Sequence, residues 1–400
     1  MFCLIWQRPV NRPATGAACP ATTGRGFMIA LCALVAVTTV AGPLSACPFC
    51  AGVFPSLAMR RETAAVAALG ELVEREETAT IYKLHFVGSG RELLGDAETV
   101  RVVAADERLP GALALLFVET PPAEEGQPLE WKVVPVDEHS AAYFLRAPDL
   151  RTPAAERLPY FVPYLEHVDP LLAEDAYREF GNSKYEDVAA VVGQFSQERV
   201  RAWLVDPAVP PERKGFYGLA AGLAADEADR RQSIELLQRL ILEPASDFRT
   251  GYDGYLGGYL VAAGEEALTF IEEHLLANPA SADGDVRHAI TALRFYHEFG
   301  RGIPQQRVQA AVRLLLDRPE FAQTVAVDLA RWQDWDAAPR VIDVLSRPGY
   351  EDKVTRRMLL GFLLSCPRED AAAAIALHRQ ETPEDVAAAE KYLALFGAGR

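Results

Sequence analysis

The stretch Arg307–Ala322, RVQAAVRLLLDRPEFA, carries the pattern that decides most of the fold. Its apolar residues fall at i, i+3, i+4, i+7 and i+8, which is one face of an α-helix. They are Val308, Ala311, Val312, Leu315 and Leu316. Pro319 then ends the pattern, because its ring removes an N–H donor and clashes with the preceding turn. The stretch predicts a helix with one apolar face to bury.

An apolar helix end followed by proline recurs throughout residues 160–400. The prolines are Pro170, Pro207, Pro244, Pro279, Pro319 and Pro348, separated by 37, 37, 35, 40 and 29 residues. Each interval holds two short helices and two turns. One such pair cannot bury its apolar face alone, whereas stacked pairs can. The repeat therefore predicts a HEAT-like α-solenoid of about six helix pairs, ending with a helix from Pro383 to Phe396.

Residues 63–147 show a different sequence pattern. Short runs rich in β-branched and aromatic residues are divided by turns such as Gly88-Ser89-Gly90. The runs that we interpret as strands are Val66–Val73, Ala79–Val87, Thr99–Ala104, Ala112–Val118, Trp131–Val136 and Ala142–Arg146. Strands without intervening helices predict a small antiparallel domain, and we expect an OB-like barrel. The proline-rich residues 148–159 are expected to be a linker. The predicted fold class is mainly α, a HEAT-like solenoid preceded by this small β domain.

Residues 1–46 have the organisation of a secretory signal peptide. Arginines precede an uncharged apolar run from Phe27 to Val40, and small residues follow it. That run is shorter than the roughly 20 residues of a membrane span. We therefore expect export to the periplasm or cell envelope, with Cys47 as the mature N-terminus. Leu44-Ser45-Ala46-Cys47 resembles a lipoprotein lipobox, so a membrane tether through a lipidated Cys47 and simple secretion both stay open.

The expected mature chain is strongly acidic. Without residues 1–46 it has 37 Lys and Arg against 56 Asp and Glu, a net charge of −19. Nucleic acids and anionic membranes bind clustered positive charge, so neither is expected as a partner. Three cysteines remain, Cys47, Cys50 and Cys366, too few for a disulfide scaffold. Packing is expected to supply the stability.

Six segments of the chain together carry a resemblance to a known group of proteins. They are CPFC at residues 47–50, LGELVE at 69–74, YLEHVDPLLAEDAYREFGNSKYEDV at 164–188, ADGDVRHAITALRFYHEFGRG at 282–302, VRLLLDRPEFA at 312–322 and DLARWQDW at 328–335. These segments resemble uncharacterised exported proteins of planctomycete bacteria. This resemblance implies export and the two-part layout of the mature chain, in which residues 47–62 form an N-terminal CPFC segment. It implies no activity. Leu165–Tyr177 separately resembles a HEAT-repeat turn, and HEAT arrays are protein-binding scaffolds, an analogy at the level of the fold.

Cys47-Pro48-Phe49-Cys50 resembles the CPxC motif of glutaredoxins and thioredoxins. That chemistry needs the first thiolate at a helix N-terminus after a strand, whereas only the signal peptide precedes Cys47 here. The alternatives are a local Cys47–Cys50 disulfide, a lipidated Cys47 that leaves Cys50 near Cys366, or two thiols that cap the N-terminus. We favour these structural interpretations over redox catalysis.

Other segments that could suggest an enzyme or a metal site lack the residue spacing of the known motifs. His297-Glu298 lacks the second histidine of HExxH, because position 301 is arginine. Asp283 and Asp285 with His288 are better explained as acids near the positive end of a helix than as metal ligands. The glycines at 88, 90 and 95 lack the spacing of phosphate loops, and no GxSxG occurs. We therefore expect no catalytic residues, no metal and no cofactor.

The segment from Arg249 to Tyr259 suggests a binding surface. Tyr252, Tyr255 and Tyr259 share one helical face, while Gly251, Gly254 and Gly258 form another that permits close helix approach. The tyrosines, with Arg249 and with Trp332 further along, are either a recognition surface or packing between repeats, and packing is favoured.

Together these patterns predict an exported, non-enzymatic protein-binding or assembly scaffold with a protein partner. A thiol-disulfide redox protein using CPFC is the alternative.

Overall fold

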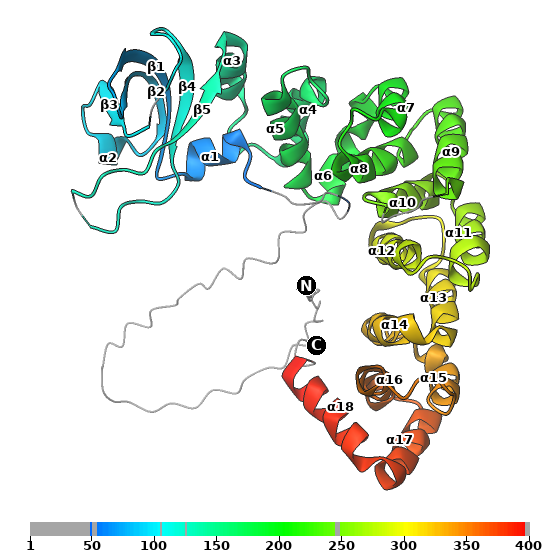
Figure 1. Cartoon of the computed structure of the whole chain (residues 1–400). Helices are drawn as coiled ribbons and strands as arrows, with labels where there is room; N and C mark the ends of the chain where they lie inside the picture. Colours follow the sequence, from blue (N-terminus) through cyan, green and yellow to red (C-terminus); the bar gives the residue numbers. More distant parts are fainter. Residues whose placement is uncertain (1–48, 50–53, 105, 125, 245–248, 397–400) are drawn as a thin grey trace, which may run out of the picture.

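In the computed structural model the described residues are 49, 54–104, 106–124, 126–244 and 249–396. They form a small antiparallel sheet followed by a mainly helical part (Figure 1). The expected signal peptide and both cysteines of the CPFC motif lie outside these residues.

The sheet has five strands in the order β3-β2-β1-β4-β5, and each neighbouring pair is antiparallel. The strands are β1 (Val66–Arg75), β2 (Thr80–Ser89), β3 (Thr99–Val102), β4 (Leu113–Val118) and β5 (Lys132–Val136). The β1–β2 pair has register shifts of the kind that β-bulges produce, and a bulge strengthens the local twist of its strand. Five of the six predicted strands are thereby confirmed.

The sixth predicted strand, Ala142–Arg146, is wrong, because this segment belongs to helix α3 (Glu138–Arg146). Asp137 caps the helix by accepting a hydrogen bond from the backbone N–H of Ser140 at 2.8 Å. Ala141 and Phe144, three residues apart, are both buried on one helical face. The cap and the helical spacing outweigh the β propensity of Tyr143 and Phe144.

Short helices flank the sheet. Helix α1 (Leu57–Thr63) precedes β1, and α2 (Arg91–Leu94) lies between β2 and β3. The two faces of the sheet belong to different cores. Leu72, Tyr82 and Leu116 pack in a small cluster of their own, whereas Leu115 and Phe117 join the large cluster that continues through the helices.

The remaining helices lie along a curved path (Figure 1). They are α4 (Ala154–Phe161), η1 (Val162–Tyr164), α5 (Pro170–Gly181), α6 (Tyr185–Val191), η2 (Val192–Gln194), α7 (Gln197–Val205), α8 (Pro211–Gly222), α9 (Glu227–Leu242), α10 (Tyr252–Ala263), α11 (Glu265–Ile271), η3 (Glu272–Leu276), α12 (Asp283–Phe299), α13 (Gln305–Arg313), η4 (Leu314–Asp317), α14 (Pro319–Arg331), η5 (Trp335–Ala337), α15 (Ala338–Val344), α16 (Lys353–Ser365), α17 (Glu369–Glu381) and α18 (Pro383–Phe396).

From α7 onward these helices form two rows. Even-numbered helices α8 to α18, here called the inner row, line the concave side, and odd-numbered helices α7 to α17, the outer row, lie behind them (Figure 1). Within the rows, α8 packs on α10, α10 on α12, α14 on α16 and α16 on α18, while α7 packs on α9 and α15 on α17. Arg294 of α12 and Asp328 of α14 form an ion pair at 2.7 Å. Each helix therefore contacts mainly its near neighbours.

The six repeat prolines lie outside helix interiors, as predicted. Pro170 and Pro319 occupy the first position of α5 and α14, where no N–H donor is needed. Pro207, Pro244 and Pro348 follow the ends of α7, α9 and α15. The predicted last helix, Pro383–Phe396, is α18 as expected.

Residues 148–159, which we expected to be a linker, connect α3 to the helices that follow and are themselves packed. Helix α4 begins within them, at Ala154, and Leu158 is fully buried in the large core. Glu62 of α1 accepts a hydrogen bond from the backbone N–H of Leu150 at 2.8 Å. The segment is thus packed against both of its neighbours rather than extended.

Candidate functional site

A buried polar cluster joins the start of α1 to α5, two elements more than 110 residues apart in sequence. Ser56, the N-cap of α1, donates a hydrogen bond from its hydroxyl to Glu179 at 2.5 Å, and the backbone N–H of Leu57 donates to Asp175 at 2.6 Å. The guanidinium of Arg157, from α4, forms an ion pair with Glu179. Glu179 is fully buried, so this ion pair balances a charge that water cannot reach.

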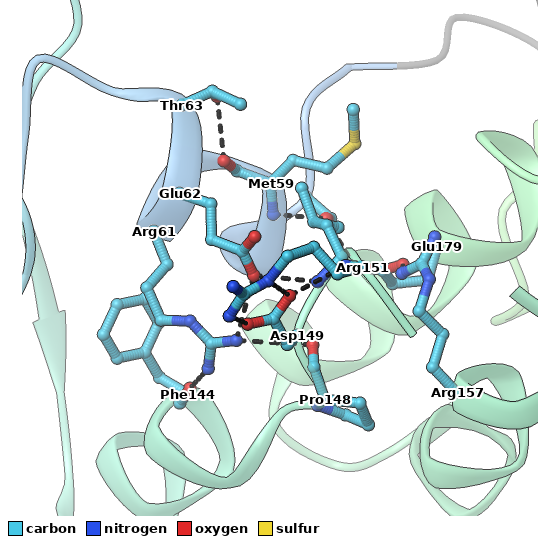
Figure 2. Close-up of polar contacts among 12 residues, drawn as sticks. Met59, Arg61, Glu62, Thr63, Phe144, Pro148, Asp149, Arg151, Arg157 and Glu179 are labelled. Atoms are coloured by element: carbon cyan, nitrogen blue, oxygen red, sulfur yellow. Dashed lines mark hydrogen bonds and ion pairs between the residues drawn. The ribbon is translucent and has the colours of Figure 1, made fainter. Parts of the chain in front are cut away.

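A second group of polar contacts lies beside this cluster (Figure 2). Arg61 donates to the carbonyl oxygens of Phe144 at 2.9 Å and Pro148 at 3.3 Å. Asp149 pairs with Arg151 in the turn that follows. These contacts fix α1 against the end of α3, and their chemistry is that of a structural junction between the sheet and the helices.

Burial dominates the electrostatics of Asp175. It raises the pKa of this carboxyl group to about 7, while the Leu57 N–H and the Tyr143 hydroxyl, which donates at 2.7 Å, oppose the rise. The charged groups that face it are Glu179, which raises the pKa further, and Arg178, which lowers it. Burial also raises the pKa of Tyr143 well above its ordinary value.

Asp175 should make stability depend on pH. Its folded-state pKa of about 7 exceeds the unfolded value of about 3.9, so the native chain holds an extra proton between these limits. The stabilisation from this group is complete below about pH 4 and is lost as the pH rises through about 7. We expect the free energy of unfolding of the wild type to fall relative to Asp175→Asn between pH 5 and pH 8. Urea titrations of both proteins would show this, and parallel profiles would contradict it.

Phe49, the described residue of the CPFC motif, packs against helices of the inner row. It is 4% exposed, and its ring meets that of Phe295 in α12 at a centroid distance of 4.7 Å. On α10, a Cβ added at Gly257 would come within 2.6 Å of the Phe49 ring. On α8, a Cβ at Gly215 would lie 3.0 Å from the Phe49 carbonyl oxygen. Phe49 thus contacts three consecutive helices of the inner row.

The structure places the two cysteine positions of the motif outside its described residues, but it describes Cys366. This cysteine is buried, is not in a disulfide in the described part of the chain, and follows the end of α16. Helix α1 begins at Leu57, well after Cys50.

The glycines of α10 permit a close helix contact, as predicted. Gly254 and Gly258 face α8, where a Cβ at either position would lie 2.0 Å from the carbonyl oxygens of Gly215 and Gly218, respectively. A Cβ at Gly222 would come within 2.1 Å of the carbonyl oxygen of Gly258. The matching glycines of α8 were missed in the sequence, although their spacing of three and four is the same signal.

The tyrosine stripe takes part in packing. Tyr252 and Tyr259 are fully buried, and Tyr255 is half-buried. The Arg249 guanidinium lies 3.5 Å from the centre of the Tyr252 ring and pairs with Asp285 at 2.6 Å. These aromatic rings pack between neighbouring helices, while the glycine face of α10 brings its backbone close to that of α8.

Trp332 also serves packing. Its ring stacks on buried His297 at 4.1 Å. Asp283 and Asp285 lie in the first turn of α12, as expected, and Asp285 is engaged by Arg249. His288 lies 3.7 Å from Asp253. Within the described ranges no three His, Cys, Asp or Glu side chains are grouped as they would be around a metal ion. None of the helices described is long and apolar enough to cross a bilayer.

Comparisons with known proteins leave the family open. No protein-family model and no curated protein matches the chain. Among solved structures, human deoxyhypusine hydroxylase in complex with glycerol aligns with 65% of this chain and 96% of its own length, at 15% identity and a TM-score of 0.27. A likeness at this score carries no argument about fold or activity. The conclusions about this chain therefore depend on its own geometry.

Proposed function

We propose that this chain is an exported protein-binding or assembly scaffold, a HEAT-like α-solenoid preceded by an OB-like domain. The burial of Phe49 in the inner row carries this proposal, because it makes the segment between the two cysteines an anchor for the helices. Two rows of helices that contact mainly their neighbours suit a solenoid. A five-stranded antiparallel sheet suits a partly open barrel. Membership of the exported planctomycete-type family is part of the proposal.

The anchor can be tested by truncating Phe49. We expect Phe49→Ala to lower the free energy of unfolding by about 1–3 kcal/mol, less than a fully enclosed phenylalanine because the segment can detach locally. Phe54→Ala is the matched control, since Phe54 is 61% exposed and only five residues away. Urea unfolding and protease cleavage before α1 would measure both effects. If the two variants were equally stable, Phe49 would not anchor the helices, and the main observation in support of the scaffold would be lost.

Partner binding can be tested by photo-crosslinking in cells that export the protein. Benzoylphenylalanine would replace exposed Leu242 and Leu377 on the outer row and Val354 on α16, with exposed Val103 beside β3 as the control. We expect the helical positions to yield the same partner protein, in amounts close to those of the scaffold and competed by the unlabelled chain. Diffuse products at all four positions would contradict a scaffold.

We also propose export with Cys47 at the mature N-terminus, either free or tethered through a lipid. The signal-peptide organisation of residues 1–46 supports export, and the lipobox-like sequence before Cys47 supports a tether. The intact mass of the protein from membrane and soluble fractions tests this: a chain that begins at Cys47 is expected, a diacylglyceryl mass on Cys47 distinguishes the tether from simple secretion, and an uncleaved chain would overturn the proposal.

A further inference from the structure

A hollow of about 360 Å³ opens between α9 and α11 on the outer row, within the size range of ligand sites. Tyr259 of α10 contributes to its wall, together with Gln238 of α9. The face of α11 and η3 supplies Glu265, Glu266, Phe270 and Glu273. Positions 266, 270 and 273 fall on one helical face, which is why they line the same hollow. We call it the α9–α11 hollow.

The hydroxyl group of Tyr259 is the unexplained feature of this hollow. The side chain is fully buried, and its hydroxyl oxygen has no hydrogen-bond partner in the described part of the chain. Native proteins satisfy nearly all buried hydroxyl groups, because an unsatisfied one loses its bonds to water without replacement. The ring itself is well packed, edge to face against Phe270 at 5.6 Å. A group that enters the hollow would supply the missing partner.

More negative than positive side chains surround the hollow. Glu265 pairs with Arg307 at 2.7 Å, but no ion pair among the described residues involves Glu266 or Glu273. Glu266 is close enough to Tyr259 for its charge to raise the pKa of the phenol, after burial itself. Two free carboxylates and a phenol oxygen offer three acceptors. The aromatic ring of Phe270 offers an apolar wall.

We propose that the α9–α11 hollow binds a lysine side chain presented by the partner protein. An ammonium group has three N–H donors and no acceptor, which matches Glu266, Glu273 and the Tyr259 oxygen one to one. The alkyl stem of lysine would pack along Phe270, as such stems do on apolar surfaces. A planar guanidinium presents five donors in a fixed fork and fits this set less well. The proposal depends on the proposed scaffold function and names the chemistry of its partner.

Calorimetry of the full chain with an acetylated tetralysine amide peptide in 0.15 M salt tests this. We expect binding that weakens at least tenfold in Glu266→Gln/Glu273→Gln. The matched control is Glu369→Gln/Glu381→Gln, which removes two exposed charges from the outer-row helix α17 and should change affinity less than twofold. We expect Tyr259→Phe to weaken binding about fivefold while its melting temperature stays level or rises, which separates a ligand-binding hydroxyl from a structural one.

Each of the following results would overturn the inference. Equal losses in the two double variants would mean general attraction to an acidic protein, and equal binding of a tetra-acetyllysine peptide would exclude the ammonium group. Cadaverine that binds as tightly as the peptide would mean a small-amine site instead of a protein contact. If the photo-crosslinked partner persists while the peptide fails to bind, the inference alone is wrong. If neither is found, the scaffold function fails with it.

Discussion

Replacing Gly254 by alanine should cost more than about 3 kcal/mol of folding free energy, or prevent folding, although alanine is the better helix former. The new Cβ would stand 2.0 Å from the backbone carbonyl oxygen of Gly215. Backbone atoms cannot move aside as a flexible side chain does, so α8 and α10 must separate. Their separation would open the core between two inner-row helices.

Gly361→Ala is the matched control for this substitution. Gly361 lies within α16, and a Cβ there would meet no atom within 4 Å. Alanine should therefore stabilise the protein by about 0.5–1 kcal/mol through helix propensity alone. Thermal and urea unfolding of both variants measure the difference. If Gly254→Ala were as stable as Gly361→Ala, the close contact between α8 and α10 would be wrong.

Breaking the Arg157–Glu179 pair should cost about 3–5 kcal/mol. Arg157→Met leaves the carboxylate of Glu179 fully buried, with the Ser56 hydroxyl as its remaining donor among the described residues. A buried charge without a counter-ion keeps its desolvation cost and loses the attraction that offsets it. Glu179→Met should be similarly destabilising, because it leaves the guanidinium unpaired.

A double-mutant cycle identifies the cause. We expect Arg157→Met with Glu179→Met to be much less destabilised than the sum of the single changes, since no lone charge remains. The surface pair Arg379–Glu390, at 2.7 Å with side chains 57% and 48% exposed, is the control. Arg379→Met should change stability by less than about 1 kcal/mol. Additive losses within the Arg157–Glu179 cycle would refute the buried pairing.

Local signals in the sequence predicted the features that depend on local physics. Proline positions located the helix ends, since the missing N–H acts wherever the residue stands. The glycine face of residues 251–258 indicated a close helix contact, and Gly215, Gly218 and Gly222 of α8 provide its other half. Helix α3 was missed because Tyr143 and Phe144 have β propensity, although Asp137 and the spacing of the buried residues already pointed to a helix.

Long-range contacts could not be predicted from the sequence. Ser56 and Glu179 are 123 residues apart, and no local pattern connects a serine before a short helix with a glutamate inside another. The α9–α11 hollow combines side chains from three helices, and no local pattern in the sequence places those side chains together. In the sequence, Phe49 was interpreted only as part of the motif that Cys47 and Cys50 define. Its burial depends on Phe295, which lies 246 residues later.

We propose that the CPFC segment anchors a binding scaffold and does not catalyse thiol-disulfide exchange. Reduction of insulin by the full-length protein with dithiothreitol tests it most directly, because only a redox-active pair accelerates that exchange. We expect insulin to be reduced at the rate of dithiothreitol alone in the presence of either the wild type or Cys50→Ser. A wild-type rate several-fold above that of Cys50→Ser would contradict it and make the protein an oxidoreductase.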